Sequence, residues 1–325
     1  MTLRTPICER FGIEHPVFLA GMGEVAFAEL VAAVSEAGGY GVLGMATSPP
    51  ERIREQMRAV RARTARPFGV DMLAALPELV EAAIDVIVEE GASCFVAGLG
   101  VPAPVIARCH AAGVQVMVVC GKVDHARRAE DAGCDAVVAQ GTEAGGHTGQ
   151  IAGMALVPQI VDAVGIPVLA AGAIVDGRGL AAALALGAQG VWMGTRFIAT
   201  REARAAKLYK ERLVAARDDG TEITRSYSGK PMRVLRNAWV DEWRARGSDI
   251  QPFPLQMAAA ARAGALGFAD DATADPERTC MPAGQGAGAI HDVPAAGDLV
   301  RSVVAEAERV LRRIGALAEA GAPGS

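Results

Sequence analysis

The stretch AVVAQGTEAGGHTG, residues 136–149, joins a short apolar run to a loop of small residues that contains one histidine. An uncharged run of this length, followed directly by glycine, is typical of a buried parallel strand. Similar runs occur on both sides of it, at Pro16–Ala20, Tyr40–Gly44, Pro67–Asp71, Ser93–Ala97, Val114–Cys120, Pro167–Gly172 and Gly190–Gly194. Together with Ala136–Gln140 they make eight predicted strands.

Amphipathic patterns with helical spacing separate these runs, for example at Phe27–Ala37, Glu51–Arg63, Pro77–Glu90, Ala126–Ala132 and Gly179–Leu186. Glycines at the ends of these patterns are typical helix stops. Eight strand–helix units match a closed barrel better than an open doubly wound sheet. The sequence therefore predicts an α/β fold, a (β/α)8 TIM barrel.

The strand pattern is lost after the eighth run. Charged segments with helical spacing follow, at Glu202–Arg217 and Val234–Arg246, and a final helix is predicted over Leu299–Ala318. We expect residues 1–200 and 290–325 to form the barrel, and residues 201–289 to form a helical insertion after strand 8 that covers the substrate. The tail Gly321–Ser325 is expected to be disordered.

Composition excludes several classes of protein. The 325 residues are 51% hydrophobic and 21% charged with a net charge of −5, which is typical of a globular chain and gives no basis for binding nucleic acid. No secretory signal is present, and the uncharged run Ala163–Val175 is too short to span a bilayer. The six cysteines show no metal-ligand spacing and are expected to be buried apolar residues. We expect a cytoplasmic protein without a metal and without contact to membranes.

The ends of the predicted strands are where a barrel of this kind carries its active site. Glycine at the end of strand 7 (Gly172), and Gly194 and Thr195 after strand 8, supply backbone N–H groups and one hydroxyl. Barrels frequently bind phosphate at these two loops. No GxGxxG follows the first strand and no P-loop motif occurs, so a dinucleotide fingerprint is not supported.

His147 is the candidate catalytic residue. Among the five histidines it is the one that follows a predicted strand, within a run of small residues that leaves room for a ligand. His110 and His125 lie on predicted helices and are expected to face solvent. Histidine acts as a general base near neutral pH. The alternative is a buried structural histidine.

Gln140-Gly141-Thr142-Glu143-Ala144-Gly145-Gly146-His147-Thr148-Gly149 resembles the signature of the nitronate monooxygenases, formerly called 2-nitropropane dioxygenases. The resemblance extends to His15–Met22, Pro67–Asp71, Ala170–Gly179, Met193–Phe197, Ser228–Asn237 and Gly284–Gly288, and so covers residues 11 to 290. It implies a barrel that holds FMN and oxidises alkyl nitronates or nitroalkanes with O2 to a carbonyl compound and nitrite. The implied partners are a small-molecule substrate and O2; a homo-oligomer is compatible with the sequence.

The resemblance also assigns site residues. It implies that FMN is bound by Ala20, Gly21, Met22, Asp71, Gln140, Gly145, Gly172, Met193, Gly194 and Thr195. The FMN phosphate would lie on Gly172, Gly194 and Thr195, and the flavin ring along Gly21 and Met22. The substrate pocket would be formed by Gly146, Gly284 and Gln285, and His147 matches the family histidine that acts as the base.

Asp71 departs from the family pattern, which has asparagine after Pro-Phe-Gly-Val. A carboxylate at this position would face an anionic reduced flavin and an anionic nitronate. Four readings are open: Asp71 stays protonated, it turns toward a cation such as Arg196, the substrate is not a simple nitronate, or Asp71 caps the following loop.

The same signature, including Glu143–His147 and the late Gly284-Gln285, also resembles the FMN-dependent enoyl-acyl-carrier-protein reductases. Those enzymes take electrons from NAD(P)H and reduce a double bond. The sequence leaves both activities open, together with a flavin-binding protein without enzymatic activity as a third reading.

Overall fold

The barrel has eight parallel strands. The computed structural model describes residues 3–267 and 272–320, so the expectation for the tail at 321–325 lies outside the described residues. The strands are β1 (Val17–Leu19), β2 (Gly41–Gly44), β3 (Phe68–Leu73), β4 (Cys94–Gly98), β5 (Gln115–Cys120), β6 (Ala136–Gln140), β8 (Val168–Ala171) and β9 (Gly190–Met193). Each matches one predicted run.

The ring closes between β1 and β2. The strands are ordered β1-β9-β8-β6-β5-β4-β3-β2. A parallel bridge between Phe18 and Tyr40 joins the two ends of this order. Leu19 N donates to Tyr40 O at 2.9 Å, and Tyr40 N donates to Val17 O at 2.9 Å. The predicted (β/α)8 fold is confirmed.

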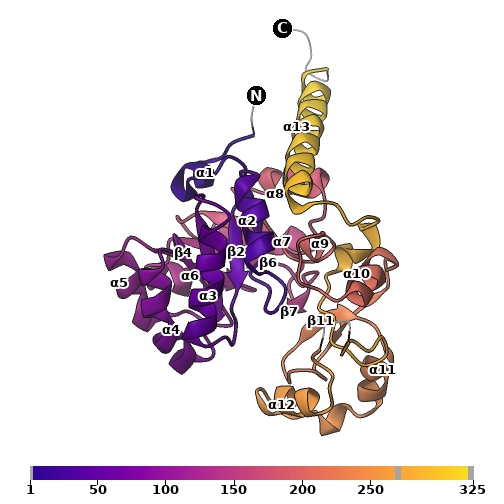
Figure 1. Cartoon of the computed structure of the whole chain (residues 1–325). Coiled ribbons are helices and arrows are strands. Elements are labelled where there is room, and N and C mark those ends of the chain that lie inside the picture. Colours follow the sequence, from indigo (N-terminus) through magenta and orange to yellow (C-terminus); the bar gives the residue numbers. More distant parts are fainter. Residues whose placement is uncertain (1–2, 268–271, 321–325) are drawn as a thin grey trace.

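Helices cover the outside of the barrel (Figure 1). They are α2 (Ala28–Glu36), α3 (Pro50–Arg61), α4 (Pro77–Glu89), α5 (Ala103–Ala111), α6 (Val123–Asp131), α7 (Gly153–Val161) and α8 (Gly177–Ala185), with the short α9 (Thr195–Ile198) after β9. The last helix, α13 (Ala296–Ala320), packs against α8 and α2, as the sequence predicts. A Cβ at Gly177 would lie 2.3 Å from Ala307 N, so glycine is required where α8 meets α13.

One end of the barrel is closed by aromatic side chains. The N-terminal helix α1 (Pro6–Phe11) places the Phe11 ring edge-on against Phe18 and Tyr40, with ring centroids 5.2 Å apart in both pairs. These rings belong to the core inside the barrel. The strands run away from this end, and the opening lies at their C-terminal ends.

The insertion contains strands that the sequence did not reveal. Strands β10 (Thr221–Thr224) and β11 (Met232–Leu235) pair antiparallel, and β11 also pairs with β7 (Gly146–His147). The helix predicted over Val234–Arg246 therefore begins later, as α11 (Ala238–Ala245), and the expectation that strands are absent here was wrong. Strands of two to four residues, one partner of which lies in the loop after β6, leave too little alternation to detect.

The rest of the insertion is helical, with α10 (Lys207–Val214), α12 (Leu255–Arg262) and the 3-10 turns η1 (Gly247–Asp249) and η2 (Gln285–Ala289). Tyr227, Trp239 and Val240 belong to a small core of its own. In Figure 1, α11 and α12 lie to one side of the barrel, and β11 lies between them and the strands. The division of the chain at residues 201 and 289, and a covering role for this segment, stay predictions.

All six cysteines are buried and unpaired, as expected. Among the described residues, no group of three or more His, Cys, Asp or Glu side chains could hold a metal ion. None of the helices in the described part of the chain is long and apolar enough to cross a membrane.

Candidate active site

A cavity of about 880 Å³ opens at the C-terminal ends of the strands. Thirteen of the predicted site residues line it, namely Ala20, Gly21, Met22, Asp71, Gln140, Gly145, Gly146, His147, Gly172, Met193, Gly194, Thr195 and Gly284. They come from five barrel strands and the segments that follow them, and from the segment before α13, because parallel strands in a barrel bring their C-terminal ends to one rim. The insertion completes the wall with Tyr227, Met232, Met257 and Leu266. The volume lies near the upper end of the ~300–1,000 Å³ that is usual for ligand sites.

The side of the cavity at β8 and β9 is built from small, uncharged residues. Gly172 has a φ of +113°, which favours glycine, and a Cβ there would lie 3.4 Å from Ala144 N and from Gly141 O. Gly194 and the Thr195 hydroxyl follow β9, and Asp176 at the start of α8 is paired with Arg178. No unpaired carboxylate of the described chain lines this side, so an anionic phosphate fits here.

The backbone at Gly284 holds two rim loops together. Gly284 N donates to Thr195 Oγ1 at 2.9 Å, and a Cβ on Gly145 would lie 2.7 Å from Gly284 N. Gln285 N donates to Glu143 O at 2.8 Å. The Gln285 side chain is exposed and does not line the cavity, so its backbone alone contributes to this arrangement.

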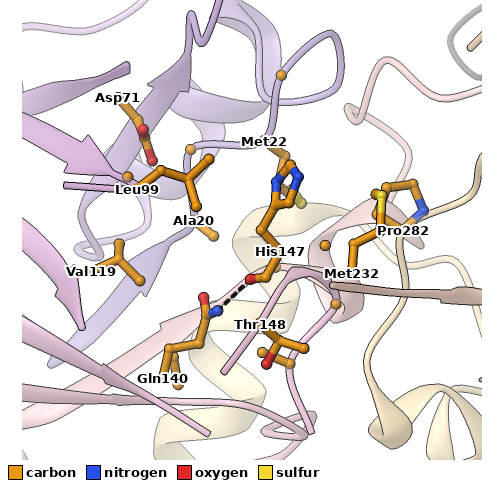
Figure 2. Close-up of a pocket in the computed structure, with 18 of the residues that line it drawn as sticks. Ala20, Met22, Asp71, Leu99, Val119, Gln140, His147, Thr148, Met232 and Pro282 are labelled. Atoms are coloured by element: carbon orange, nitrogen blue, oxygen red, sulfur yellow. Dashed lines mark hydrogen bonds between the residues drawn. The ribbon is translucent and has the colours of Figure 1, made fainter. Parts of the chain in front are cut away.

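The loop that carries His147 is fixed from both ends. Gln140 Nε2 donates to His147 O at 2.7 Å, the dashed line in Figure 2. Thr148 Oγ1 donates to Gly141 O at 3.1 Å, and His147 pairs with Met232 of β11. Figure 2 shows the imidazole in the middle of the cavity, next to Met22.

His147 is held as a neutral base. Burial, together with the positive charge of Lys230, lowers its pKa from 6.5 to about 4. Ser228 Oγ lies 2.9 Å from His147 Nε2 and 3.2 Å from Lys230 O, and it accepts from Lys230 N at 3.3 Å. This contact fixes the orientation of the imidazole, whose neutral form has one unprotonated ring nitrogen. No local pattern in the sequence indicates Ser228 as a partner of His147.

Asp71 lies within β3, before its last residues Met72 and Leu73, and is buried, with 9% of its surface exposed. A Cβ on Gly21 would lie 2.2 Å from Asp71 Cβ, so the β1 loop packs directly on this side chain. Burial raises the pKa of the carboxyl well above its usual value. Figure 2 shows the carboxyl group entering the cavity from a different side than His147.

Arg196 does not neutralise Asp71. Its guanidinium pairs with Asp292 and donates to Ala199 O at 3.2 Å. The reading in which Asp71 turns toward Arg196 is therefore wrong, and the protonated form is the one that burial favours.

Four basic residues at the cavity were missed by the sequence reasoning. Lys122 before α6, His125 in its first turn and Arg128 in its last turn line the cavity, as does Lys230 of the insertion. His125 is exposed, as predicted, but it faces the mouth of the cavity rather than solvent alone. A cation on an exposed helix face usually has no function, so the sequence alone carried no signal for these residues.

Comparison with known proteins places the chain in one family of flavin enzymes. The model of the family described as nitronate monooxygenase matches residues 4–83 and 80–306. A Mycobacterium tuberculosis protein named (3aS,4S,5R,7aS)-5-hydroxy-7a-methyl-1-oxo-octahydro-1H-indene-4-carboxyl-CoA dehydrogenase is 36% identical, over 98% of this chain and 100% of that protein.

Two solved structures are similar along nearly the whole chain. FabK from Thermotoga maritima superposes with a TM-score of 0.90 at 35% identity, covering 97% of this chain and 100% of its own. Nitroalkane oxidase from Streptomyces ansochromogenes superposes with a TM-score of 0.79 at 32% identity, covering 92% and 98%.

Proposed function

Since the chain belongs to the nitronate monooxygenase family and is a flavin-type oxidoreductase, we propose that it oxidises carbon acids at a bound FMN, with His147 as the general base. The first substrate class is alkyl nitronates and nitroalkanes, which O2 converts to a carbonyl compound and nitrite. The observation that carries the proposal is the His147 imidazole, which lies in the cavity in contact with Ser228 and which burial keeps neutral.

The residues present fit FMN. The side of the cavity at Gly172, Gly194 and Thr195 can take the phosphate, because small residues allow close approach and the Thr195 hydroxyl, which accepts from Gly284 N, keeps its own proton to donate. The loop Ala20-Gly21-Met22 borders the cavity for the ring, and Gln140 Oε1 is left to accept from it, since Nε2 is used by His147 O. When bound, FMN accepts electrons from the substrate and delivers them to O2.

The chain's own groups handle the proton. The neutral His147 imidazole removes the α-proton of a neutral nitroalkane with its unprotonated ring nitrogen, and the contact between Nε2 and Ser228 Oγ orients the ring. A preformed nitronate has already lost that proton. The neutral Asp71 carboxyl can donate a hydrogen bond to the bound substrate, and it adds no negative charge beside an anionic one.

An acyl thioester is the second candidate substrate, because its α-proton is also acidic. The specific observation in its favour is the size of the cavity, about 880 Å³, with apolar walls contributed by Met232, Met257 and Leu266. The Mycobacterium tuberculosis relative is named as a dehydrogenase of a carboxyl-CoA, which is chemistry of the same kind. FabK similarly supports the enoyl reductase alternative.

The test begins with the purified protein. Its chromophore is released and its mass determined; FMN is expected, and a protein without flavin would overturn the proposal. The yellow protein is then mixed without oxygen with a nitronate, an acyl-CoA or NADPH. Bleaching by the nitronate, with nitrite formed in air, supports the first substrate class, whereas bleaching by acyl-CoA or NADPH alone identifies the second candidate or the reductase.

A further inference from the structure

The mouth of the cavity carries positive charge that FMN does not require. Lys122 at the start of α6 and Arg128 in its last turn line the cavity, and Lys230 lines it from the insertion. The phosphate side at Gly172 and Thr195 belongs to β8 and β9, whereas α6 follows β5, on another part of the rim. These cations are therefore separate from the residues proposed to hold the FMN phosphate.

Carboxylates do not neutralise these cations. Within the described chain, none of Lys122, Arg128 and Lys230 forms an ion pair. The acidic residues that line the cavity are Glu24 and Asp71. Glu24 is paired with Arg52 at 3.1 Å and Arg204 at 3.2 Å, and Asp71 is buried. A chain with a net charge of −5 thus concentrates uncompensated positive charge at one cavity.

Together with burial, the positive charges of these three residues lower the pKa values of the two histidines that line the cavity. Partial burial and the positive charges of Arg128 and Lys122 lower the pKa of His125, which lies between them on α6. The positive charge of Lys230 similarly contributes to the lowered pKa of His147. The cations are therefore close to both the mouth and the proposed base. Lys122 is at the start of α6, where the N-terminal backbone N–H groups add partial positive charge, whereas Arg128 lies in the last turn of the helix.

We propose that Lys122, Arg128 and Lys230 bind the phosphates of an adenosine diphosphate that carries a further phosphate on its ribose, a group present in coenzyme A as the 3′-phosphate and in NADPH as the 2′-phosphate. Several separated cations match a diphosphate and a ribose phosphate better than a single carboxylate. The inference rests on the proposed flavin chemistry, because the anionic part is held at the mouth while the reactive end of the same molecule reaches the cavity at His147. A nitroalkane has no group that would use these cations.

Calorimetric titration of the FMN-loaded protein tests this binding without any turnover. The probes are coenzyme A, NADPH, pantetheine and inorganic phosphate. We expect coenzyme A or NADPH to bind, and pantetheine, which lacks the phosphates, to bind at least about 10-fold more weakly. Binding of coenzyme A identifies an acyl carrier and binding of NADPH identifies a reductant; both support the site. Equal affinity for pantetheine would overturn it.

Variants locate the site. The double variant Lys122→Ala/Arg128→Ala, and separately Lys230→Ala, should weaken binding by about 10-fold or more, and added salt should weaken binding to the unaltered protein. Arg127→Ala removes an exposed cation of the same helix that does not line the cavity, and it should bind like the unaltered protein. If the double variant binds as tightly as Arg127→Ala, the proposal is wrong. Since turnover is not measured, a failure of the proposed oxidation does not affect this result.

Discussion

The cavity brings together two ionisable side chains, His147 and Asp71, whose pKa values burial shifts in opposite directions. On the β7 loop, burial lowers the pKa of His147 to about 4, and on β3 it raises the pKa of Asp71 well above its usual value. His147 has Ser228 as a partner, whereas Asp71 makes no side-chain hydrogen bond within the described residues. In both cases the neutral form is favoured, because burial penalises charge. A neutral histidine accepts a proton and a neutral carboxyl donates one, so the same physical cause produces a base and an acid.

The largest expected effect comes from removing the base. His147→Asn should reduce turnover of a neutral nitroalkane by ~10²–10⁴-fold, the usual contribution of a general base. Oxidation of the preformed nitronate should fall much less, because that substrate needs no base. Steady-state kinetics on both forms of one compound, together with the FMN content of the variant, measure this difference.

An equal loss on the nitroalkane and the nitronate would mean that His147 orients the substrate and does not remove its proton. Ser228→Ala is the matched control, because it leaves the imidazole in place and removes the contact to Nε2. It should lose less than His147→Asn on the nitroalkane.

The second effect is on stability in acid. The pKa of His147 falls from 6.5 in the unfolded chain to about 4 in the folded protein. The stability that this lowering represents is fully present above pH 6.5 and is lost as the pH falls toward 4. It amounts to about 3 kcal/mol, at 1.36 kcal/mol per pKa unit. Denaturant unfolding at several pH values should therefore show a smaller acid loss for His147→Asn, and parallel curves for both proteins would contradict the low pKa.

The third expected effect is on FMN binding, at residues that are distinct from His147 and Asp71. Thr195→Val with Gly194→Ala removes the hydroxyl proposed to donate to the FMN phosphate, and loss of such a charged hydrogen bond costs ~1.5–3 kcal/mol. A Cβ at Gly194 would lie 3.4 Å from Met22 Sδ and 3.5 Å from Ala20 Cβ, so the barrel can accept it. We expect weaker FMN binding by fluorescence titration, with an unchanged circular dichroism spectrum. Full flavin content after purification would place the phosphate elsewhere.

The barrel could be predicted from sequence because its strands are continuous apolar runs, most of which end in or are followed directly by glycine, as Ala136–Gln140 is by Gly141. The position of His147 followed from the same rule. Its partner Ser228 lies 81 residues away and reaches it through pairing of β7 with β11, which no local pattern encodes. Lys122 and Lys230 resemble solvated surface cations until the fold brings them to one cavity.

The smallest expected effect tests the acid side of the comparison. Asp71→Asn keeps a hydrogen-bond donor of nearly the same size, so turnover of a nitronate at neutral pH should change by less than about 2-fold. Asp71→Leu removes the donor and should lose about 2- to 12-fold, from ~0.5–1.5 kcal/mol for one hydrogen bond. The pH dependence of nitronate turnover should also differ between the unaltered protein and Asp71→Asn. The unaltered protein should lose activity at alkaline pH as the Asp71 carboxyl ionises, whereas the amide of Asp71→Asn does not ionise and should keep its activity.

The pH dependence of the free energy of unfolding is a second test of Asp71. Its sign is opposite to that expected for His147. The folded-state pKa of Asp71 is raised, so its contribution is fully present below the unfolded value near 3.8 and is lost as the pH rises through the folded pKa. Asp71→Asn should therefore gain stability relative to the unaltered protein as the pH rises, whereas His147→Asn gains as the pH falls. If Asp71→Asn instead raises nitronate turnover strongly at neutral pH and shows no such stability trend, Asp71 is ionised in the folded protein. The cavity would then hold a carboxylate beside its substrate, and the nitronate would be the less suitable of the two proposed substrate classes.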